Sequence, residues 1–523
     1  MEFKEIRKCS FYLNSKSRSC KFPVFGDSIY CIFHLRIIDN IQVIQDKNSH
    51  NRNIKDKLVL CPIDRKHYIS ITNMLSHIRK CSKVRDIAYE LSQPFCIQTS
   101  EPPLSLQNKF QALLDIQNLI KSTNMDKICE ENLNNRRNDL IKNLESKLEF
   151  LDLLYRECLH HLPYNPYEVE KIDNKLEETI NNQILRNKHD IQAFDIFNTC
   201  LKDGFIQNKE NRFDYDTSKC MFVEFGAGNA LLTHWFIKLI IENIQKNSGS
   251  TQISDLRAIL IDKESRRKQL EKHSKFIKSL RLRLDIETFD FKSLIEACET
   301  GNSDLMYFSF SSGYIPWLLE YLVKADIWIP NIPKDVNPSE YLRKIEPNKL
   351  KDILTLLSRG GGPDVKKIED NIKDNIINRP INHLFIFAKH LCGCGFDLAL
   401  TSSIDAIQKL NSGSTVYIAM AGCCHHRCNS KQHLGTELIT SSSKWESYFS
   451  SDEDCFDFIT FVSSWATGAT DWRQNEGYKA KFILDTCRIQ WLRSKGFMNV
   501  KLINYTSKHV TPENVLLIAS KQV

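Results

Sequence analysis

One short stretch, residues 222–229, constrains the fold of this chain more than any other. It reads Phe-Val-Glu-Phe-Gly-Ala-Gly-Asn, so an apolar run ends in an acid and breaks into glycines before a predicted helix. A buried parallel strand accounts for the apolar run, and Gly226 and Gly228 let the backbone approach a ligand where a Cβ would collide. The pattern predicts a nucleotide-type site at the start of that helix. The alternative is a simple tight turn, because Ala230 occupies the third glycine position.

The number of cysteines and the hydropathy of the chain indicate the cellular compartment of the protein. The chain has 18 cysteines, and its first ten residues contain no apolar run of the kind found in a signal peptide. Reduced thiols or metal ligands are therefore expected rather than disulfides, in a protein of the nucleus or cytoplasm. The longest apolar runs, such as residues 383–388, fall far below the roughly 20 residues of a membrane helix. We expect no membrane association.

Length and charge point to several domains and a polyanionic partner. With 523 residues, the chain is long enough for two or more domains. Residues 1–100 contain 17 Lys and Arg against 9 Asp and Glu, whereas the whole chain carries a net charge of only +7. The basic charge is therefore concentrated in the N-terminal segment, where a nucleic acid would be bound.

The first predicted metal site lies in that basic segment. Its four ligands are Cys9, Cys20, Cys31 and His34. Thiolate and imidazole ligands suit tetrahedral zinc, and so short a segment has little core to hold it without a metal. We predict a CCCH-type zinc finger within residues 1–45. The alternative is a set of scattered thiols, because the spacings are wider than those of a common finger.

The second predicted metal site follows closely, with ligands Cys61, His67, His77 and Cys81. This Cys-His-His-Cys order resembles the small finger of a spliceosomal RNA-binding protein and of a tRNA methyltransferase family. We predict a CHHC-type finger within residues 55–90, with buried core histidines as the alternative. Five basic residues surround it: Arg65, Lys66, Arg79, Lys80 and Lys83. They suit phosphate contacts, or they form an ordinary solvated face.

A linker and a helical region, residues 91–185, separate the fingers from a larger domain at 186–523. The linker begins with Pro94 and the Pro102–Pro103 pair. An apolar stripe at helical spacing follows: Leu140, Leu144, Leu148, Leu151 and Tyr155. We expect this helix to pack against the next domain rather than to form an extended arm.

From residue 219 onward, strands alternate with helices, which predicts an α/β sheet. Residues 256–261 form a predicted second strand that ends at Asp262, where ribose hydroxyls are held in doubly wound nucleotide sites; a helix N-cap is the alternative. Polar and apolar side chains alternate along residues 281–286, which predicts a third strand. This strand includes Asp285, and Asp290 lies just beyond it. These two acids either face an adenine or cap the next helix.

Later in the chain, two more strands carry polar groups to the same edge of the sheet. Residues 384–388 lead into Lys389–Gly393 and then Asp397, and residues 416–420 lead into Cys423–Cys428. In the second segment we expect a compact loop rather than a third metal, because adjacent ligands point apart and no second pair lies nearby. Between the early and late strands, residues 325–380 contain six prolines and a run of glycines, which predicts an insertion with short helices.

Taken together, these motifs resemble the eukaryotic tRNA 2′-O-ribose methyltransferases that modify nucleotide 4 of the acceptor stem. The resemblance covers both fingers and seven further segments: Lys188–His189, Val223–Gly228, Arg281–Ile286, Lys389–Gly393, Cys423–Cys428, Ser464–Ala466 and Thr511–Leu517. It implies a Rossmann-like methyltransferase sheet with helices on both faces, preceded by two small zinc fingers and a helical linker. It also implies tRNA as the substrate, S-adenosylmethionine as the cofactor and two structural zinc ions.

The resemblance further implies roles for individual residues. S-adenosylmethionine would lie over Gly226 and Gly228, with Glu224 near its cationic end and Asp262 on its ribose. A ribose 2′-hydroxyl is a poor nucleophile while protonated, so a base or a cation is needed beside it. Five residues are candidates: Lys389, His390, Asp397, His425 and His426. Lys389 can stabilise an oxyanion or act as the base if burial lowers its pKa, and His390 is the alternative proton acceptor.

Two other functions fit parts of the sequence. A non-catalytic zinc-finger RNA-binding protein of the spliceosomal type would explain the fingers but not the glycine motif. A small-molecule methyltransferase would leave the basic N-terminal segment without a use. The sequence therefore favours an RNA methyltransferase over both.

Overall fold

The computed structural model describes the following residues: 12–13, 18–19, 58–61, 68–70, 77, 81–96, 143–162, 164–167, 187–203, 215–248, 256–264, 269–273, 277–306, 365–441 and 445–523. The chain divides into two compact units, one of Met1–Cys61 with Arg65–Met74 and one of Pro62–Asp64 with Leu75–Val523. Five predicted zinc ligands lie outside the described residues: Cys9, Cys20, Cys31, His34 and His67.

The smaller unit contains two short antiparallel strand pairs. They are formed by β1 (Tyr12–Leu13) with β2 (Arg18–Ser19) and by β3 (Leu58–Leu60) with β4 (Tyr68–Ser70). In the second pair, Leu60 lies opposite Tyr68, so Cys61 follows directly on a strand of a hairpin.

The larger unit is built on a seven-stranded mixed sheet with the order β10-β11-β9-β8-β5-β6-β7. The strands are β5 (Cys220–Phe225), β6 (Leu256–Ile261), β7 (Ile277–Leu282), β8 (His383–Cys392), β9 (Thr415–Cys423), β10 (Asn499–Asn504) and β11 (Val515–Gln522). The five strands from β7 to β9 are parallel, whereas β11 pairs antiparallel with both β9 and β10. The order runs one way from β5 to β7 and the other way from β8 to β9. A topological switch point therefore lies between β5 and β8, where open α/β sheets bind their ligands.

The α-helices of this unit, among the described residues, are α3 (Ser82–Leu91), α6 (Leu144–His161), α8 (Lys188–Lys202), α9 (Leu231–Ser248), α10 (Phe291–Thr300), α14 (Val365–Asn375), α15 (Gly395–Ile407), α16 (Glu437–Thr440), α17 (Asp452–Ser463), α18 (Trp465–Gly468) and α19 (Trp472–Ser494). Short 3-10 turns connect several of them: η4 (Thr217–Lys219), η5 (Leu270–His273), η6 (Ile286–Thr288), η8 (His425–Arg427) and η9 (Trp445–Ser447).

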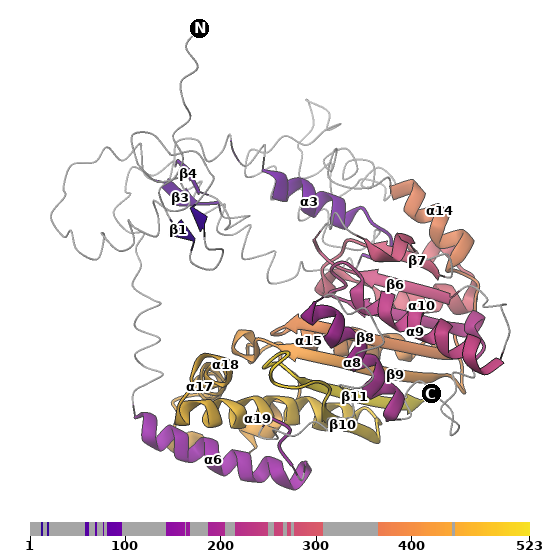
Figure 1. Ribbon diagram of the computed structural model, residues 1–523. Coiled ribbons are helices and arrows are strands. Elements are labelled where there is room, and N and C mark those ends of the chain that lie inside the picture. The colour runs from indigo at the N-terminus through magenta and orange to yellow at the C-terminus, as the bar shows by residue number, and fades with distance from the viewer. Residues whose placement is uncertain are drawn as a thin grey trace. The chain divides into compact units, whose positions relative to one another are not determined.

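Helices cover both faces of the sheet, as the α/β prediction requires (Figure 1). Alternate strand residues, such as Phe222 and Phe385, form one core with α8 and α9. The intervening residues face the other way, and the Phe225 ring contacts Phe289 and Phe291, at the start of α10. Because side chains alternate across a strand, the fully buried β5 has apolar residues on both faces.

The part of the predicted apolar stripe that the structure describes, residues 144–155, packs against α19, whereas Leu140 lies outside the described residues. Phe150, Leu151 and Leu154 are buried on α6, and the Tyr155 ring meets Phe482 of α19 edge-on, with the ring centroids 5.6 Å apart. The helix α19 is buried around most of its circumference, which is the pattern of a central helix. The prediction that this region packs on the next domain is confirmed.

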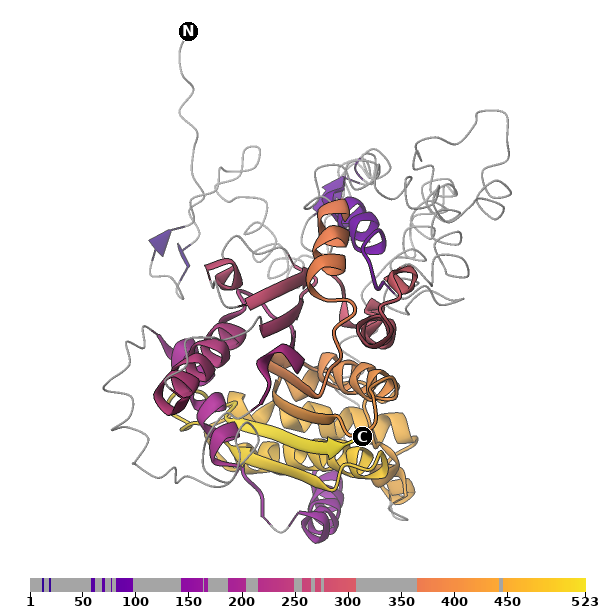
Figure 2. The same cartoon turned by 90° about the vertical axis from the view of Figure 1, so that its right-hand side faces the viewer.

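The edge strand β7 is covered by two segments that lie far apart in the sequence, one around α3 and the other α14 (Figure 2). The segment after α3 bonds to the strand's end, where Gln93 donates to the carbonyl of Arg283 and accepts from its amide. The helix α14 covers the strand at Ser279, through the amide of Asn371. Of the predicted insertion at 325–380, the structure describes residues 365–380, and α14 forms most of this part.

The third strand was predicted at 281–286, and this placement was wrong: β7 spans Ile277–Leu282. Burial at every second residue continues beyond the hydrogen-bonded strand, because Leu280, Leu282 and Leu284 are all buried. A two-residue period therefore locates the buried face but not the strand end. In the described part of the chain, no helix is both long and apolar enough to cross a membrane.

Candidate active site at the carboxyl edge of the sheet

The glycine segment forms a tight loop at the switch point, between β5 and α9. Gly226, Gly228 and Ala230 all adopt positive φ angles, of 64°, 51° and 59°. The alanine in the third glycine position thus takes a backbone conformation that glycine adopts more easily. A Cβ on Gly226 would lie 3.0 Å from the Leu391 side chain, so the residue also allows close packing on β8.

Glu224 lies buried beneath this loop. Its Oε2 accepts hydrogen bonds from the Thr233 amide at 3.0 Å and from the Thr233 hydroxyl at 2.5 Å, in the first turn of α9. Burial raises the pKa of the Glu224 carboxyl to about 7, against the opposing effect of these hydrogen bonds and of the Arg281 and Lys389 charges. The carboxylate connects the end of β5 to the start of α9, and a cation nearby would favour its ionised form.

The second predicted cofactor acid, Asp262, follows β6 directly. Its Oδ2 accepts from the Gly228 amide at 2.6 Å, and its Oδ1 accepts from the Glu264 amide at 2.8 Å. The carboxylate therefore holds the glycine loop in place. Each of its oxygens still offers a second lone pair to a hydroxyl group of a ligand.

The remaining two acids cap helical turns. Asp285 accepts from the Glu287 amide as the N-cap of η6, and Asp290 accepts from the amide and the hydroxyl of Ser293 as the N-cap of α10. Of the two alternatives that the sequence left open, the structure thus forms the helix cap at both residues.

A β-bulge shapes the end of β8. Lys389 lies opposite Ala421 of β9, and Leu391 lies opposite Gly422, so His390 is an extra residue between them. His390 has a φ of 59°. In a regular strand, two consecutive residues point to opposite faces. Here the bulge turns both Lys389 and His390 toward α8, because bulges re-aim side chains.

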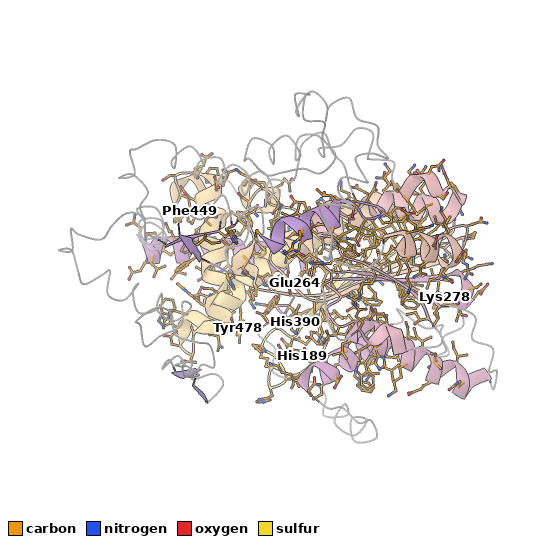
Figure 3. All side chains as sticks on the ribbon, turned by 90° about the horizontal axis from the view of Figure 1, so that it is seen from above. His189, Glu264, Lys278, His390, Phe449 and Tyr478 are labelled. Carbon is orange, nitrogen blue, oxygen red and sulfur yellow. The ribbon has the colours of Figure 1, made fainter. Side chains whose placement is uncertain are left out.

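The two side chains share one acceptor, the Oε1 of Gln192. Lys389 Nζ lies 3.3 Å from this oxygen and His390 Nε2 lies 2.9 Å from it. Gln192 is 1% exposed, and its Oε1 also lies 3.3 Å from His189 Nδ1. Figure 3 shows His189 and His390 side by side, with ring centroids 6.2 Å apart. Gln192 thus gathers three nitrogen-bearing side chains at the switch point.

Burial shifts both titratable groups of this cluster. It lowers the pKa of Lys389 to about 8, although Glu224 and Asp190 nearby oppose the shift. It lowers the pKa of His390 to about 4, and the positive charge of Lys389 acts in the same direction. At neutral pH, His390 is therefore a neutral ring that donates from Nε2 to Gln192, and a fraction of Lys389 is a neutral amine.

Asp397 and His425 lie in a separate, buried network around α19. Arg488 donates from Nε and Nη2 to the two oxygens of Asp397, at 2.9 and 2.7 Å. Asp485 accepts from Arg488 at 2.8 Å and lies 3.1 Å from His425 Nε2, and Tyr167 donates to its other oxygen. The structure therefore brings Lys389 and His390 together and places Asp397 and His425 among structural partners.

In this network, burial and neighbouring positive charges shift the pKa values of the carboxyl groups in opposite directions. Burial alone would raise the pKa of Asp397, but the Arg488 guanidinium reverses this and holds the pKa below its usual range. The pKa of Asp485 is also lowered, because His425 and Arg488 outweigh the effect of burial. Both carboxylates are charged at neutral pH and depend on Arg488.

The segment Cys423–Cys428 has neighbours that the sequence did not predict. Cys392 at the end of β8 lies close to Cys423 and Cys424, and Cys394 lies close to Cys428. The expectation that no second pair lies nearby was wrong, because β8 and β9 run side by side and bring their ends together. The pKa of the Cys392 thiol is lowered to about 6 by a hydrogen bond from Cys423, whose own pKa is raised.

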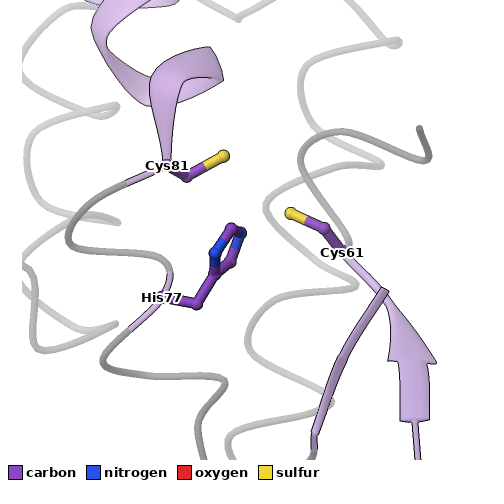
Figure 4. Close-up of side chains that lie close together, drawn as sticks. All are labelled: Cys61, His77 and Cys81. Atoms are coloured by element: carbon purple, nitrogen blue, oxygen red, sulfur yellow. The ribbon is translucent and has the colours of Figure 1, made fainter. Parts of the chain in front are cut away.

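The described ligands of the second finger also lie close together. Cys61, His77 and Cys81 each offer one ligand atom, and these atoms lie within 4.8 Å of one another (Figure 4). Two thiolates and an imidazole form a donor set that suits zinc.

Two residues of these clusters were missed in the sequence, Gln192 and Arg488. Gln192 stands one helical turn after His189, so the Lys188–His189 pair was a signal for its position. Arg488 stands in a helix with no distinguishing motif, about 90 residues after its partner Asp397.

Two family models match the chain. The model described as Methyltransferase TRM13 matches residues 200–303, 348–476 and 469–520, which include the glycine loop and both strand ends of the site. The model described as CCCH zinc finger in TRM13 protein matches residues 7–35, which include all four predicted ligands of the first finger.

Curated relatives align over nearly the whole chain. A protein of Vanderwaltozyma polyspora named tRNA:m(4)X modification enzyme TRM13 is 21% identical, covering 99% of each chain. A protein of Saccharomyces cerevisiae with the same name is 22% identical, over 99% of this chain and 97% of the relative. A human protein named as a homolog is 23% identical, over 98% and 94%. No solved structure matches this chain.

Proposed function

The chain belongs to the TRM13 methyltransferase family, and from this we propose that it transfers a methyl group to the ribose 2′-hydroxyl of nucleotide 4 in the tRNA acceptor stem. Methyltransferase membership implies S-adenosylmethionine as the methyl donor. The relatives are named as tRNA modification enzymes, which supports a tRNA substrate. We infer a hydroxyl acceptor mainly from Lys389, whose half-buried amine lies at the switch point and can take up the proton of a hydroxyl group.

The residues at the switch point suit a cationic, ribose-bearing cofactor. The glycine loop exposes backbone without Cβ atoms at Gly226 and Gly228, where a ligand can approach closely. Glu224 is a buried acid whose ionised form a positive charge would stabilise, and Asp262 has lone pairs for ribose hydroxyls. When bound, S-adenosylmethionine supplies an electrophilic methyl group.

Lys389 is the residue that we assign to the proton of the acceptor. A ribose hydroxyl needs a base near neutral pH, and a base is most effective when its pKa lies near the working pH. The pKa of Lys389 is about 8, whereas that of His390 is about 4. We therefore infer that Lys389 accepts the proton, and that Gln192 and His390 position its amine.

Transfer of labelled methyl from S-adenosylmethionine to tRNA transcripts by the full chain tests this function. We expect label at nucleotide 4 of the transcript, as mapped by digestion and mass spectrometry. A transcript with a 2′-deoxy nucleotide 4 should accept no label, whereas a matched transcript with a 2′-deoxy nucleotide 5 should accept it normally. Label on the base, or equal labelling of both deoxy transcripts, would contradict the 2′-O assignment.

The rival function, a non-catalytic zinc-finger RNA-binding protein, makes a different prediction for the same protein. Such a protein would bind tRNA but would give no heat of binding with S-adenosylmethionine in a calorimetric titration. The closely packed glycine loop and its support by Asp262 favour the catalytic alternative.

Replacing Cys61 by alanine is expected to remove about one zinc ion per chain, because it takes away one of the thiolates that zinc prefers in a structural site. We also expect weaker tRNA binding with little change in S-adenosylmethionine binding, because the glycine loop lies in the catalytic sheet. Metal analysis and two binding titrations measure these effects. Cys158→Ala is the matched control, because that buried thiol lies on α6, outside both fingers. Equal zinc content in Cys61→Ala and the parent would refute Cys61 as a ligand.

A further inference from the structure

Three thiols converge just beyond the Lys389–His390 bulge. They belong to Cys392, at the end of β8, and to Cys423 and Cys424, at the end of β9. Cys392 Sγ lies 3.1 Å from Cys423 Sγ and 3.7 Å from Cys424 Sγ. All three sulfur atoms lie within 4.8 Å of one another. Residues from two strands about 30 positions apart in the sequence thus form one compact donor set.

The backbone is shaped to bring these sulfurs together. The bulge at His390 shifts the register so that Cys392 lies directly opposite Cys423 in the parallel pair. Cys424 adopts a φ of 53°, which is rare for a residue with a Cβ. This left-handed turn brings the thiols of two consecutive residues to one side, although consecutive ligands usually point apart. Such strain is unfavourable and persists where the surrounding structure requires it, commonly at functional sites.

A glycine allows the two loops to approach each other at this point. Gly393 has a φ of 54°, and its amide donates to the carbonyl of Cys423 at 3.2 Å. A Cβ on Gly393 would lie 2.8 Å from both the Cβ and the carbonyl oxygen of Arg427. The close approach of the loops therefore depends on glycine at this position.

A second group of potential metal ligands lies nearby and consists of Cys394, Asp397 and Cys428. It differs from the first group because a buried arginine already binds its ligand atoms. Arg488 already binds both carboxylate oxygens of Asp397 and donates to Cys428 Sγ at 3.3 Å. Cys394 Sγ accepts from the Asn429 amide at 3.2 Å. A cation would have to displace the buried guanidinium from this group. In the first group, Arg427 is a hydrogen-bonding and charged neighbour of Cys392, but its side chain is exposed, so a cation can displace it into solvent without leaving a buried charge.

We propose that Cys392, Cys423 and Cys424 bind a zinc ion, in addition to the ions of the two fingers. Thiolates are soft ligands that zinc prefers, and tetrahedral zinc takes four ligands, so three protein thiolates leave one position for water or another group. The site is accessible from solvent, because Cys392 is exposed. The ion joins the ends of β8 and β9 and thereby fixes the bulge that carries Lys389 and His390. This proposal rests on the geometry of the thiols alone and is independent of the reaction at nucleotide 4.

Metal analysis of the full chain tests the site. Cys392→Ser and Cys423→Ser should each contain about one zinc ion fewer per chain than the parent, because each removes a ligand from a three-thiolate set. Cys394→Ser is the matched control, since it changes a neighbouring thiol of the other group, and it should retain the parent content. Unchanged zinc in the first two variants overturns the proposal, and so does an equal loss in the control.

Thiol labelling of the unmodified protein provides a second measurement that does not depend on a folded variant. We expect Cys392, although exposed, to resist alkylation until a chelator removes the metal, and then to react within the normal time for a free thiol. Peptide mass spectrometry locates the label. Rapid labelling without chelator overturns the proposal. Labelling that requires a reductant rather than a chelator assigns a disulfide to Cys392 and also overturns it.

Discussion

Replacing Lys389 by methionine is expected to lower the rate of methyl transfer by about 10²- to 10⁴-fold, the usual effect of losing a general base. Methionine keeps the length and apolar stem of lysine but has no amine at the position beside Gln192. Binding of S-adenosylmethionine and tRNA should change little, because the glycine loop and the fingers are untouched. Lys409→Met is the matched control, since Lys409 pairs with Glu296 on the surface, beyond the end of α15, and should keep parent activity.

The pH profile of the parent enzyme identifies the form of Lys389 that acts. The pKa of Lys389 lies at about 8, so the neutral amine becomes more abundant as pH rises toward 8. If this form accepts the proton, the rate rises about tenfold per pH unit below pH 8 and is level above it. A rate that falls above pH 8 would instead assign the ammonium form, which stabilises an alkoxide. A flat profile from pH 6 to 9, with full activity in Lys389→Met, would exclude Lys389 from the reaction.

Arg488→Met is expected to cause the largest loss of stability, about 3–5 kcal/mol in the free energy of unfolding. The guanidinium is buried and binds both Asp397 and Asp485, so its removal leaves two buried carboxylates without their cation. Urea denaturation followed by circular dichroism measures the loss. Arg473→Met is the control on the same helix, because Arg473 pairs with Asp471 on the surface, where ion pairs contribute little. Equal stability of the two variants would contradict the prediction.

The same network makes a prediction about acid. The pKa values of Asp397 and Asp485 are lower in the folded protein than in the unfolded chain. A carboxyl group whose pKa is lowered by folding stabilises the folded state at pH values above its pKa in the unfolded chain, roughly 4. This stability is lost as the pH falls below that pKa. The parent should therefore lose stability steeply below about pH 4. Arg488→Met should show a weaker dependence there, because Asp397 has lost the main charge that lowers its pKa and Asp485 keeps only His425 as a neighbouring basic group.

The sheet could be predicted largely from local sequence. A run of apolar residues interrupted only by Arg257 and followed by an acid located β6 correctly at Leu256–Ile261, and the glycine motif placed the loop after β5. These elements are specified by residues next to one another in the chain. The end of β7 could not be found in this way, since Leu284 continues the buried alternation after the strand's hydrogen bonds have ended.

The site could be predicted only in part, for a related reason. Lys389 and His390 were candidates because polar groups after a strand lie at the active edge. Their common partner Gln192 lies about 200 residues earlier, and the partners of Asp397 and His425 lie on α19. Pairings across such distances depend on how helices pack on the sheet, and nothing in the local pattern specifies them. The thiol cluster was missed because it requires the register of β8 against β9.

The bulge in β8 has a consequence for how this protein can change over evolution. Substitution at position 390 alters one side chain, but deletion of that single residue would remove the bulge and make Lys389 and Leu391 consecutive residues of a regular strand. Lys389 would then lose the neighbouring imidazole that shares Gln192 with it, although the composition of the segment would hardly change. We therefore expect relatives to vary in the identity of the residue at 390 more readily than in the length of the segment between Ala388 and Gly393.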